Sequence, residues 1–151
     1  MSNRLRNGFN AVPTVLFRMN LGGLFGRRFL MITTRGRKTG RVRRSVIEVV
    51  ENDRPTDSWT VFAAHGPNTG WYRNATSGGP VVITVGRRRF PVHVDDLDRA
   101  ARVAVLRDYQ AAHPRLAALL GTAILGRDFS AAESSLDALA DGLRSLRFTS
   151  R

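Results

Sequence analysis

The chain has 151 residues, 42% of them hydrophobic, which is enough for one folded domain with its own core and too apolar for a disordered chain. The absence of cysteine excludes disulfides, thiolate catalysis, zinc ribbons and iron–sulfur clusters, and the three histidines lack metal-ligand spacing, so we predict no metal site. The net charge of +12 favours an anionic partner such as a phosphate, an anionic lipid or nucleic acid.

The apolar residues are scattered, and this bears on the location of the protein. No run of about 18 apolar residues is present, so we expect no membrane-spanning helix. Asn10, Pro13, Arg18 and Asn20 interrupt the apolar stretch that a signal peptide would need. We therefore expect a cytoplasmic protein.

The positive charge is concentrated near the N-terminus. Residues 1–44 contain eleven Arg or Lys and no Asp or Glu, and the first acid is Glu48. The other 107 residues are almost balanced, with 13 basic and 12 acidic side chains. Lys38 is the only lysine in a chain that otherwise uses arginine.

The first two thirds of the chain have the pattern of short strands after a basic start. Residues 3–20 show loose helical spacing, so we predict a basic helical segment over 1–23 that Pro13 kinks or restarts. Short apolar or alternating runs bounded by turn residues then predict five strands, over 29–34, 43–50, 59–64, 81–85 and 90–94. We expect a polar connection over 51–58, a loop over 65–70, one or two helical turns over 71–77 and a hairpin turn over 86–88.

The last third changes to helical periodicity. Residues 97–112 predict a helix with Asp95 and Asp96 as candidate caps, and Ser130-Ala131-Ala132-Glu133 fits a capping box for a later helix. We assign an extra helical segment to 114–146 and a closing strand to 146–149. The whole pattern predicts one α+β domain over 1–151, with flanking helices and about six mostly antiparallel strands in a sheet or small barrel.

The connection between the first two predicted strands is exceptionally basic. It holds six cations within ten residues, from Arg35 to Arg44, together with Gly36 and Gly40. Glycines allow a tight bend, exposed backbone N–H groups can cradle phosphate oxygens, and guanidinium groups bind phosphate or carboxylate in pairs. A solvated hairpin tip kept soluble by charge is the alternative. Because no acid lies nearby in the sequence, we favour a bound anion.

Several motifs resemble the deazaflavin-dependent nitroreductase family, whose members are small split β-barrels. The motifs are Gly36-Arg37-Lys38-Thr39-Gly40, Ala63-Ala64-His65-Gly66, Trp71-Tyr72-Arg73-Asn74 and the hairpin over 80–90. The resemblance covers residues 24–95. It implies coenzyme F-420, a deazaflavin that carries a phosphate and an oligoglutamate tail, which is the kind of anion that the basic turn would hold.

The resemblance also implies a set of site residues. Contacts to the phosphate or the tail would come from Arg37, Lys38, Thr39 and Arg43. The second strand would line the cofactor with Arg44, Ser45, Val46 and Ile47. The deazaflavin ring would run beside the backbone of Ala63, Ala64, His65 and Gly66. The pocket would be closed by Gly70, Trp71, Tyr72 and Asn74.

The implied reaction is hydride transfer from reduced coenzyme F-420 to an electrophilic acceptor such as a quinone, a nitro compound or an enone. His65 is the candidate general acid, with Tyr72 or solvent as alternatives. Family members often carry tyrosines after the hairpin and its helix, whereas residues 113–120 contain none, so the acceptor does not carry over.

Other functions stay open at this point. The domain could instead be an FMN-binding split-barrel oxidoreductase, a cofactor carrier without catalysis, or a basic nucleic-acid-binding module. We expect no nucleic acid, because the strands lack a run of aromatic residues for stacking bases. The N-terminal segment could also rest on an anionic membrane as a peripheral contact, and a dimer is one option for the oligomeric state.

Overall fold

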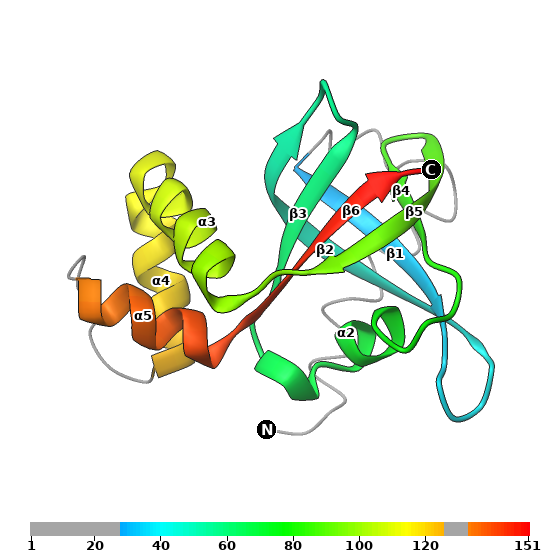
Figure 1. Ribbon diagram of the computed structural model, residues 1–151, viewed down its shortest axis with the longest axis horizontal. Coiled ribbons are helices and arrows are strands. Elements are labelled where there is room, and N and C mark those ends of the chain that lie inside the picture. Colours follow the sequence, from blue (N-terminus) through cyan, green and yellow to red (C-terminus); the bar gives the residue numbers. More distant parts are fainter. Residues whose placement is uncertain (1–27, 126–132) are drawn as a thin grey trace.

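Six strands form a closed barrel in the computed structural model, which describes residues 28–125 and 133–151. The strands are β1 (Phe29–Arg35), β2 (Val42–Asp53), β3 (Ser58–Ala63), β4 (Val82–Val85), β5 (Arg88–Asp96) and β6 (Arg144–Ser150). They follow the order β1-β2-β3-β6-β5-β4, with β4 closing on β1, and every pair is antiparallel (Figure 1). The predicted α+β split barrel is confirmed.

The second strand is considerably longer than its sequence pattern predicts. β2 continues to Asp53 and pairs with the start of β3, after an irregularity between Val49 and Glu51. The predicted polar connection over 51–58 is therefore only a tight turn. Its side chains are exposed on a ribbon that extends beyond the core, so no apolar alternation marks them as a strand.

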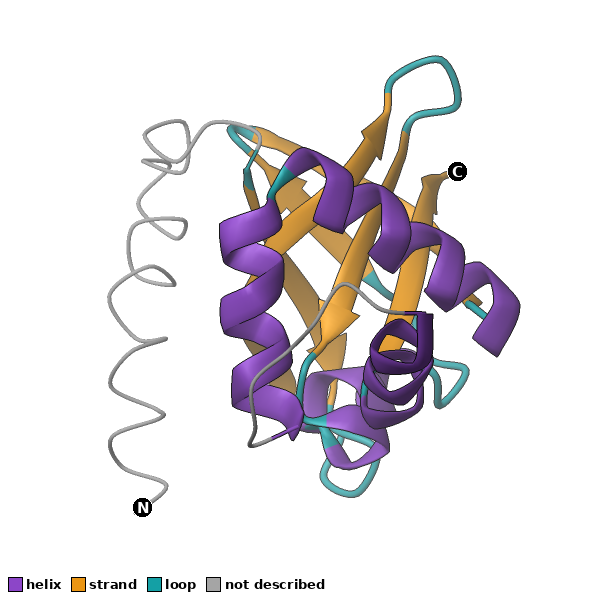
Figure 2. Cartoon of the chain, turned by 90° about the vertical axis from the view of Figure 1, so that its left-hand side faces the viewer, coloured by secondary structure: helices purple, strands orange, loops and turns teal. Residues whose placement is uncertain are grey.

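The helices follow the barrel strands in two groups. The short helices η2 (Gly66–Asn68) and α2 (Gly70–Ala75) lie between β3 and β4. The longer helices α3 (Arg99–Ala112), α4 (Pro114–Leu125) and α5 (Glu133–Gly142) precede β6. These three gather on one side of the barrel, which faces the viewer in Figure 2.

The N-terminal cap of α3 is an aspartate, as predicted, but it is a different aspartate from the two candidates. The Asp98 carboxylate accepts a hydrogen bond from the Ala101 backbone N–H at 2.9 Å. Asp95 and Asp96, the predicted caps, are instead the last residues of β5, where they pair with β6. Cross-strand pairing thus extends β5 past the point at which the local sequence favours a helix start.

Apolar packing divides into two clusters. The barrel interior contains Leu30, Ile32, Val61, Ile83 and Phe148, which are at most 1% exposed. A second cluster joins α3, α4 and α5 to the outer face of the barrel through Phe62. The Phe62 ring meets the Tyr109 ring edge-on, with centroids 5.6 Å apart. This cluster holds the helical layer on the barrel.

Some predictions lie outside the described residues. The N-terminal helical segment over 1–23 and the capping-box residues 130–132 belong there. The predicted helical segment over 114–146 is observed as α4 and α5, but its last residues, from Arg144, belong to β6. Among the described helices, none is long and apolar enough to cross a bilayer.

Candidate functional site

One end of the barrel gathers most of the residues that the sequence singled out. The turn between β1 and β2 (residues 36–41, called the basic turn below), η2 and α2 all lie at the lower end in Figure 1. Arg43 and Arg44 lie at the start of β2, next to the turn, where they pair with Thr34 and Thr33 of β1. Barrel closure therefore places segments about thirty residues apart in the sequence around one region.

The basic turn is fastened by its own hydrogen bonds. The Gly40 N–H donates to the Gly36 carbonyl at 2.8 Å, and the Gly36 N–H donates to the Arg41 carbonyl at 2.7 Å. Gly40 has a φ of +69°, a conformation that favours glycine. A Cβ on Gly36 would lie 2.9 Å from the Thr39 Oγ1 atom. The backbone of the bend thus favours glycine at position 40, whereas a side chain at position 36 would require the Thr39 hydroxyl to move.

Asn74 ties α2 to the basic turn. Its Oδ1 atom accepts from the Arg37 Nη1 atom at 2.9 Å and lies 3.4 Å from the Arg37 backbone nitrogen. The Asn74 side chain is buried, with 9% exposure, so its amide oxygen is shielded from competing water. The two motifs identified separately in the sequence therefore form one structural unit.

The cations around the basic turn have no anionic partner in the described part of the chain. Arg35, Arg37, Lys38, Arg41, Arg43 and Arg44 are largely exposed. None of them forms an ion pair there, whereas Arg28 pairs with Glu48 and Arg147 with Glu51. The backbone N–H groups of Lys38 and Thr39 also lack an acceptor among the described residues. The turn thus offers positive charge and unused donors together.

The predicted lining residues of β2 do not share one face. Successive side chains of a strand point to opposite sides, so Arg44 and Val46 alternate with Ser45 and Ile47. Ile47 lies in the barrel core with 8% exposure, while Arg44 is exposed. The side chain of Ile47 therefore packs inside the barrel. Any contact of Ile47 with a cofactor, as predicted, would have to come from its backbone.

The segment after β3 combines small residues with an exposed histidine. Ala63 is buried, Ala64 is half-buried, and His65 is exposed immediately before η2. Gly66 has a φ of +71°, and a Cβ there would lie 3.0 Å from the Gly142 carbonyl oxygen at the end of α5. Gly66 is therefore required by helix packing, a reason that the sequence did not reveal.

The two aromatic residues of α2 face the barrel. Trp71 is half-buried against the core, and Gly70, the first residue of α2, is exposed. Tyr72 is buried, and its hydroxyl donates to the Asp96 Oδ2 atom at 2.5 Å. Burial, and then the hydrogen bond and charge of Asp96, raise the pKa of the Tyr72 hydroxyl. This proton is committed to Asp96, and a catalytic role for Tyr72 stays a prediction.

Asp96 is a site residue that sequence reasoning missed. It was assigned to a helix cap, because it lies in an acidic run just before a helical pattern. Only the register of β5 against β6 brings it to the barrel end beside α2. No local signal in the sequence points to this pairing.

The model of the F-420-H(2)-dependent quinone reductase family matches residues 14–117. This chain belongs to that family. The match contains the basic turn, the segment after β3 and α2, and it ends in α4. The expected resemblance to deazaflavin-dependent enzymes is thereby confirmed. The rest of α4, α5 and the barrel strand β6 lie beyond the matched range of this quinone reductase family member.

Solved structures share the fold of this family member at low sequence identity. An F420-H2 dependent reductase superposes with a TM-score of 0.53 at 17% identity, covering 82% of this chain and 95% of that one. A structure described as a domain-swapped dimer has a TM-score of 0.52 at 17% identity and covers 91% and 98%. A pyridoxamine 5'-phosphate oxidase-related, FMN-binding protein from Nostoc punctiforme has a TM-score of 0.52 at 12% identity and covers 93% and 78%. No curated protein sequence matches the chain.

Proposed function

We propose that the chain binds coenzyme F-420 at the basic turn and transfers a hydride from it to a quinone, a nitro compound or an activated enone. Family membership identifies a coenzyme F-420-dependent oxidoreductase. The mode of binding, the residues involved and the acceptor are the parts proposed here. FMN is the alternative cofactor, because an FMN-binding protein shares the fold.

The observation that carries the proposal is the basic turn, which is rich in unpaired cations and joined to α2 through Arg37 and Asn74. A phosphate and a chain of carboxylates supply the acceptors that these guanidinium and N–H groups lack. Lys38 and Arg43 are exposed and can turn toward such a tail. The residues present therefore fit the anionic part of the cofactor.

The reactive ring would lie beside the segment after β3. The reduced deazaflavin, when bound, supplies a hydride. Ala63 and Ala64 have small side chains that permit a flat ring to approach the backbone. His65 is the proposed proton donor to the product, because its exposed imidazole follows directly on this segment. Asn74 would orient Arg37 and so set the position of the phosphate.

The test is a titration of the purified full chain with coenzyme F-420, followed by the fluorescence anisotropy of the deazaflavin. A triple variant, Arg37→Gln, Lys38→Gln and Arg43→Gln, removes three cations from the site. We expect the dissociation constant to rise at least a hundredfold, or about 3 kcal/mol, because charged hydrogen bonds contribute roughly 1.5–3 kcal/mol each.

A matched control loses the same charge elsewhere. Arg89, Arg115 and Arg151 are exposed and lie outside the basic turn, so their triple change to Gln reduces the net charge equally. The control is expected to bind within about threefold of the parent chain. If both variants weakened binding equally, the effect would come from net charge and not from the basic turn. If FMN bound with saturation and coenzyme F-420 did not bind, FMN would be the cofactor.

A further inference from the structure

A cavity lies at the barrel end opposite the basic turn, and it is called the second cavity below because the proposed cofactor site is the first ligand site. Its volume is about 360 Å³, and its lining comes from the turn between β2 and β3 and from the β4–β5 hairpin. In Figure 1 these two connections lie at the upper end, whereas the basic turn and α2 lie at the lower end. An occupant of this cavity would therefore be remote from the proposed cofactor site.

The wall of the second cavity is aromatic and apolar. Trp59 and Phe90 line it with ring centroids 4.9 Å apart and planes tilted by 45°, and Val85 lies beside them. Aromatic walls of this kind favour flat, apolar ligands, which bury their faces against the rings. The volume of about 360 Å³ is at the small end of the range of about 300–1,000 Å³ found for ligand sites, so one or two fused rings would fit in it.

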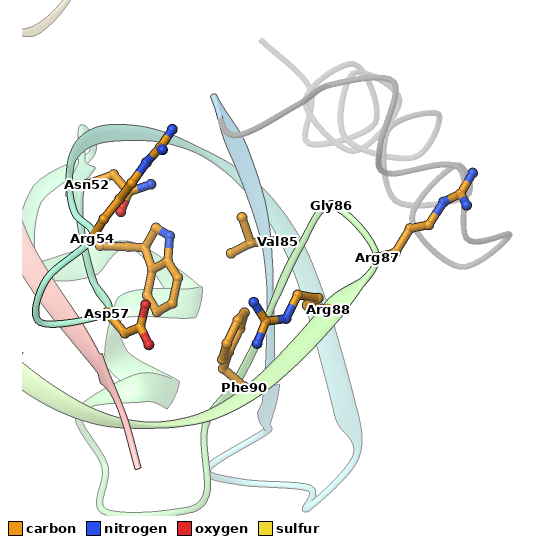
Figure 3. Close-up of a pocket in the computed structure, with 9 residues that line it drawn as sticks. Asn52, Arg54, Asp57, Val85, Gly86, Arg87, Arg88 and Phe90 are labelled. Atoms are coloured by element: carbon orange, nitrogen blue, oxygen red, sulfur yellow. The ribbon is translucent and has the colours of Figure 1, made fainter.

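The lining of the second cavity contains three arginines and one aspartate, so the cavity has an excess of positive charge. Arg54 and Asp57 lie on one side of it, Arg88 lies on the other side, and the Arg87 side chain points away (Figure 3). The Arg88 guanidinium lies over the Phe90 ring, 4.9 Å from its centre. A negatively charged ligand would offset this excess of positive charge.

The turn that carries two of these groups is held in a fixed shape. The Asp57 N–H donates to the Arg54 carbonyl at 3.2 Å, and the Asp57 carbonyl accepts from the Ser150 N–H at 3.0 Å. Asp57 has a φ of 47°, which non-glycine residues seldom adopt. A strained residue held by two backbone hydrogen bonds presents its carboxylate at a defined place.

One buried donor in the wall of the second cavity lacks a hydrogen-bond acceptor in the described part of the chain. The Trp59 side chain is 5% exposed, and its Nε1–H group has no acceptor among the described residues. Indole and guanidinium groups only donate. The Arg54 and Arg88 guanidinium groups form no ion pair among the described residues, so they are the donors that a ligand oxygen at this cavity would meet.

We propose that the second cavity binds a small aromatic carboxylate of one or two fused rings. The rings would lie against Trp59 and Phe90, and the carboxylate would face Arg54 and Arg88. The proposal does not depend on the proposed reductase function, because the two sites share no residue and lie at opposite ends of the barrel.

The test is a titration of the full chain with 2-naphthoate, followed in two-dimensional ¹H–¹⁵N NMR spectra. The chain has two tryptophans, so the indole N–H region contains two signals, which Trp71→Phe assigns. We expect the Trp59 signal to shift with saturation and the Trp71 signal to stay. The neutral analogue 2-naphthalenemethanol should bind at least tenfold more weakly.

Two double variants separate the site from general charge effects. Arg54→Gln with Arg88→Gln should weaken 2-naphthoate at least tenfold, whereas Arg89→Gln with Arg115→Gln, both exposed and outside the lining, should change it less than twofold. No shift of the Trp59 signal, equal binding of the neutral analogue, or equal weakening in both variants would overturn the proposal. Binding should persist in the triple variant of the basic turn, so failure of one proposal leaves the other standing.

Discussion

At the barrel end that carries the basic turn, single residues make contacts that their residue types alone do not indicate. Asn74 is one of four residues in a motif, yet its amide oxygen is the atom that fastens Arg37. Gly66 belongs to a segment that the family resemblance assigns to cofactor binding. Because Gly66 has no side chain, the end of α5 can also pack close to its backbone. Binding and packing therefore impose separate demands on neighbouring positions.

Asn74→Ala should lower both the stability of the domain and its affinity for the proposed cofactor. Loss of the acceptor frees Arg37, so we expect the dissociation constant for coenzyme F-420 to rise about tenfold, and the free energy of unfolding to fall by about 1–2 kcal/mol. Ser77→Ala is the matched control, because the Ser77 hydroxyl donates to the Asn74 carbonyl at 2.7 Å without touching the turn. Anisotropy and urea titrations would measure both quantities, and identical binding in the two variants would contradict the role of Asn74.

Gly66→Ala should destabilise the domain by about 2 kcal/mol or more. The substitution adds the strain of a positive φ, roughly 1–2 kcal/mol, to a contact of 3.0 Å with the Gly142 carbonyl. Gly86→Ala separates the two effects, because Gly86 has a φ of +60° and no atom of the described residues lies within 4 Å of the added Cβ. Urea unfolding should show a smaller loss for Gly86→Ala, and equal losses would mean that the contact with α5 relaxes freely.

At the scale of elements, α2 is the part that links the site to the barrel. It reaches the basic turn through Asn74 and the end of β5 through Tyr72. Thr76 caps the C-terminal end of α2, where its hydroxyl donates a hydrogen bond to the Tyr72 carbonyl at 2.9 Å. A six-residue helix gains little from its own hydrogen bonds, so these side-chain anchors position it.

The anchor at Tyr72 predicts a dependence of stability on alkaline pH. Its folded pKa is raised, so its stabilising effect is complete below the pKa of the unfolded tyrosine and is lost as the pH rises through the folded value. Burial also raises the pKa of Tyr109, the only other tyrosine. The free energy of unfolding should therefore fall as the pH rises above about 10.

Tyr72→Phe should lower stability by about 1 kcal/mol at pH 7 and make the alkaline decline shallower. Tyr109→Phe is the comparison, and the double variant should have the shallowest decline of all. Urea unfolding between pH 8 and pH 11 would measure the slopes. If the parent chain and the double variant declined alike, the tyrosines would not be the groups responsible.

At the scale of the whole molecule, the excess of positive charge attracts anions over a long range. The net charge is +12, and the described cations of the basic turn have no paired acids to offset them. An anionic ligand is therefore attracted before it makes contact, an effect that salt screens over about 10 Å at 0.1 M.

Cofactor affinity should consequently fall with ionic strength, roughly tenfold between 0.05 and 0.5 M sodium chloride. The triple variant of the basic turn should lose most of this dependence, whereas the Arg89, Arg115 and Arg151 variant should keep most of it. Anisotropy titrations at several salt concentrations would give the slopes. A parent chain insensitive to salt would indicate that ring contacts, and not the anionic tail, dominate binding.

The sequence by itself determined the features that depend on neighbours along the chain. Alternating and apolar runs indicated the strands, glycines with six nearby cations indicated the basic turn, and the motifs indicated the family. These signals are local, because strand periodicity, turn geometry and charge density are set within a few residues.

The tertiary structure alone decided what residues distant in sequence do together. Arg37 meets Asn74, and Tyr72 meets Asp96, because the barrel closes with β6 between β3 and β5. The same closure places Arg54 and Arg88 around the second cavity. Such contacts depend on strand order and register, which no short stretch of sequence encodes, because each is fixed by the packing of the whole core.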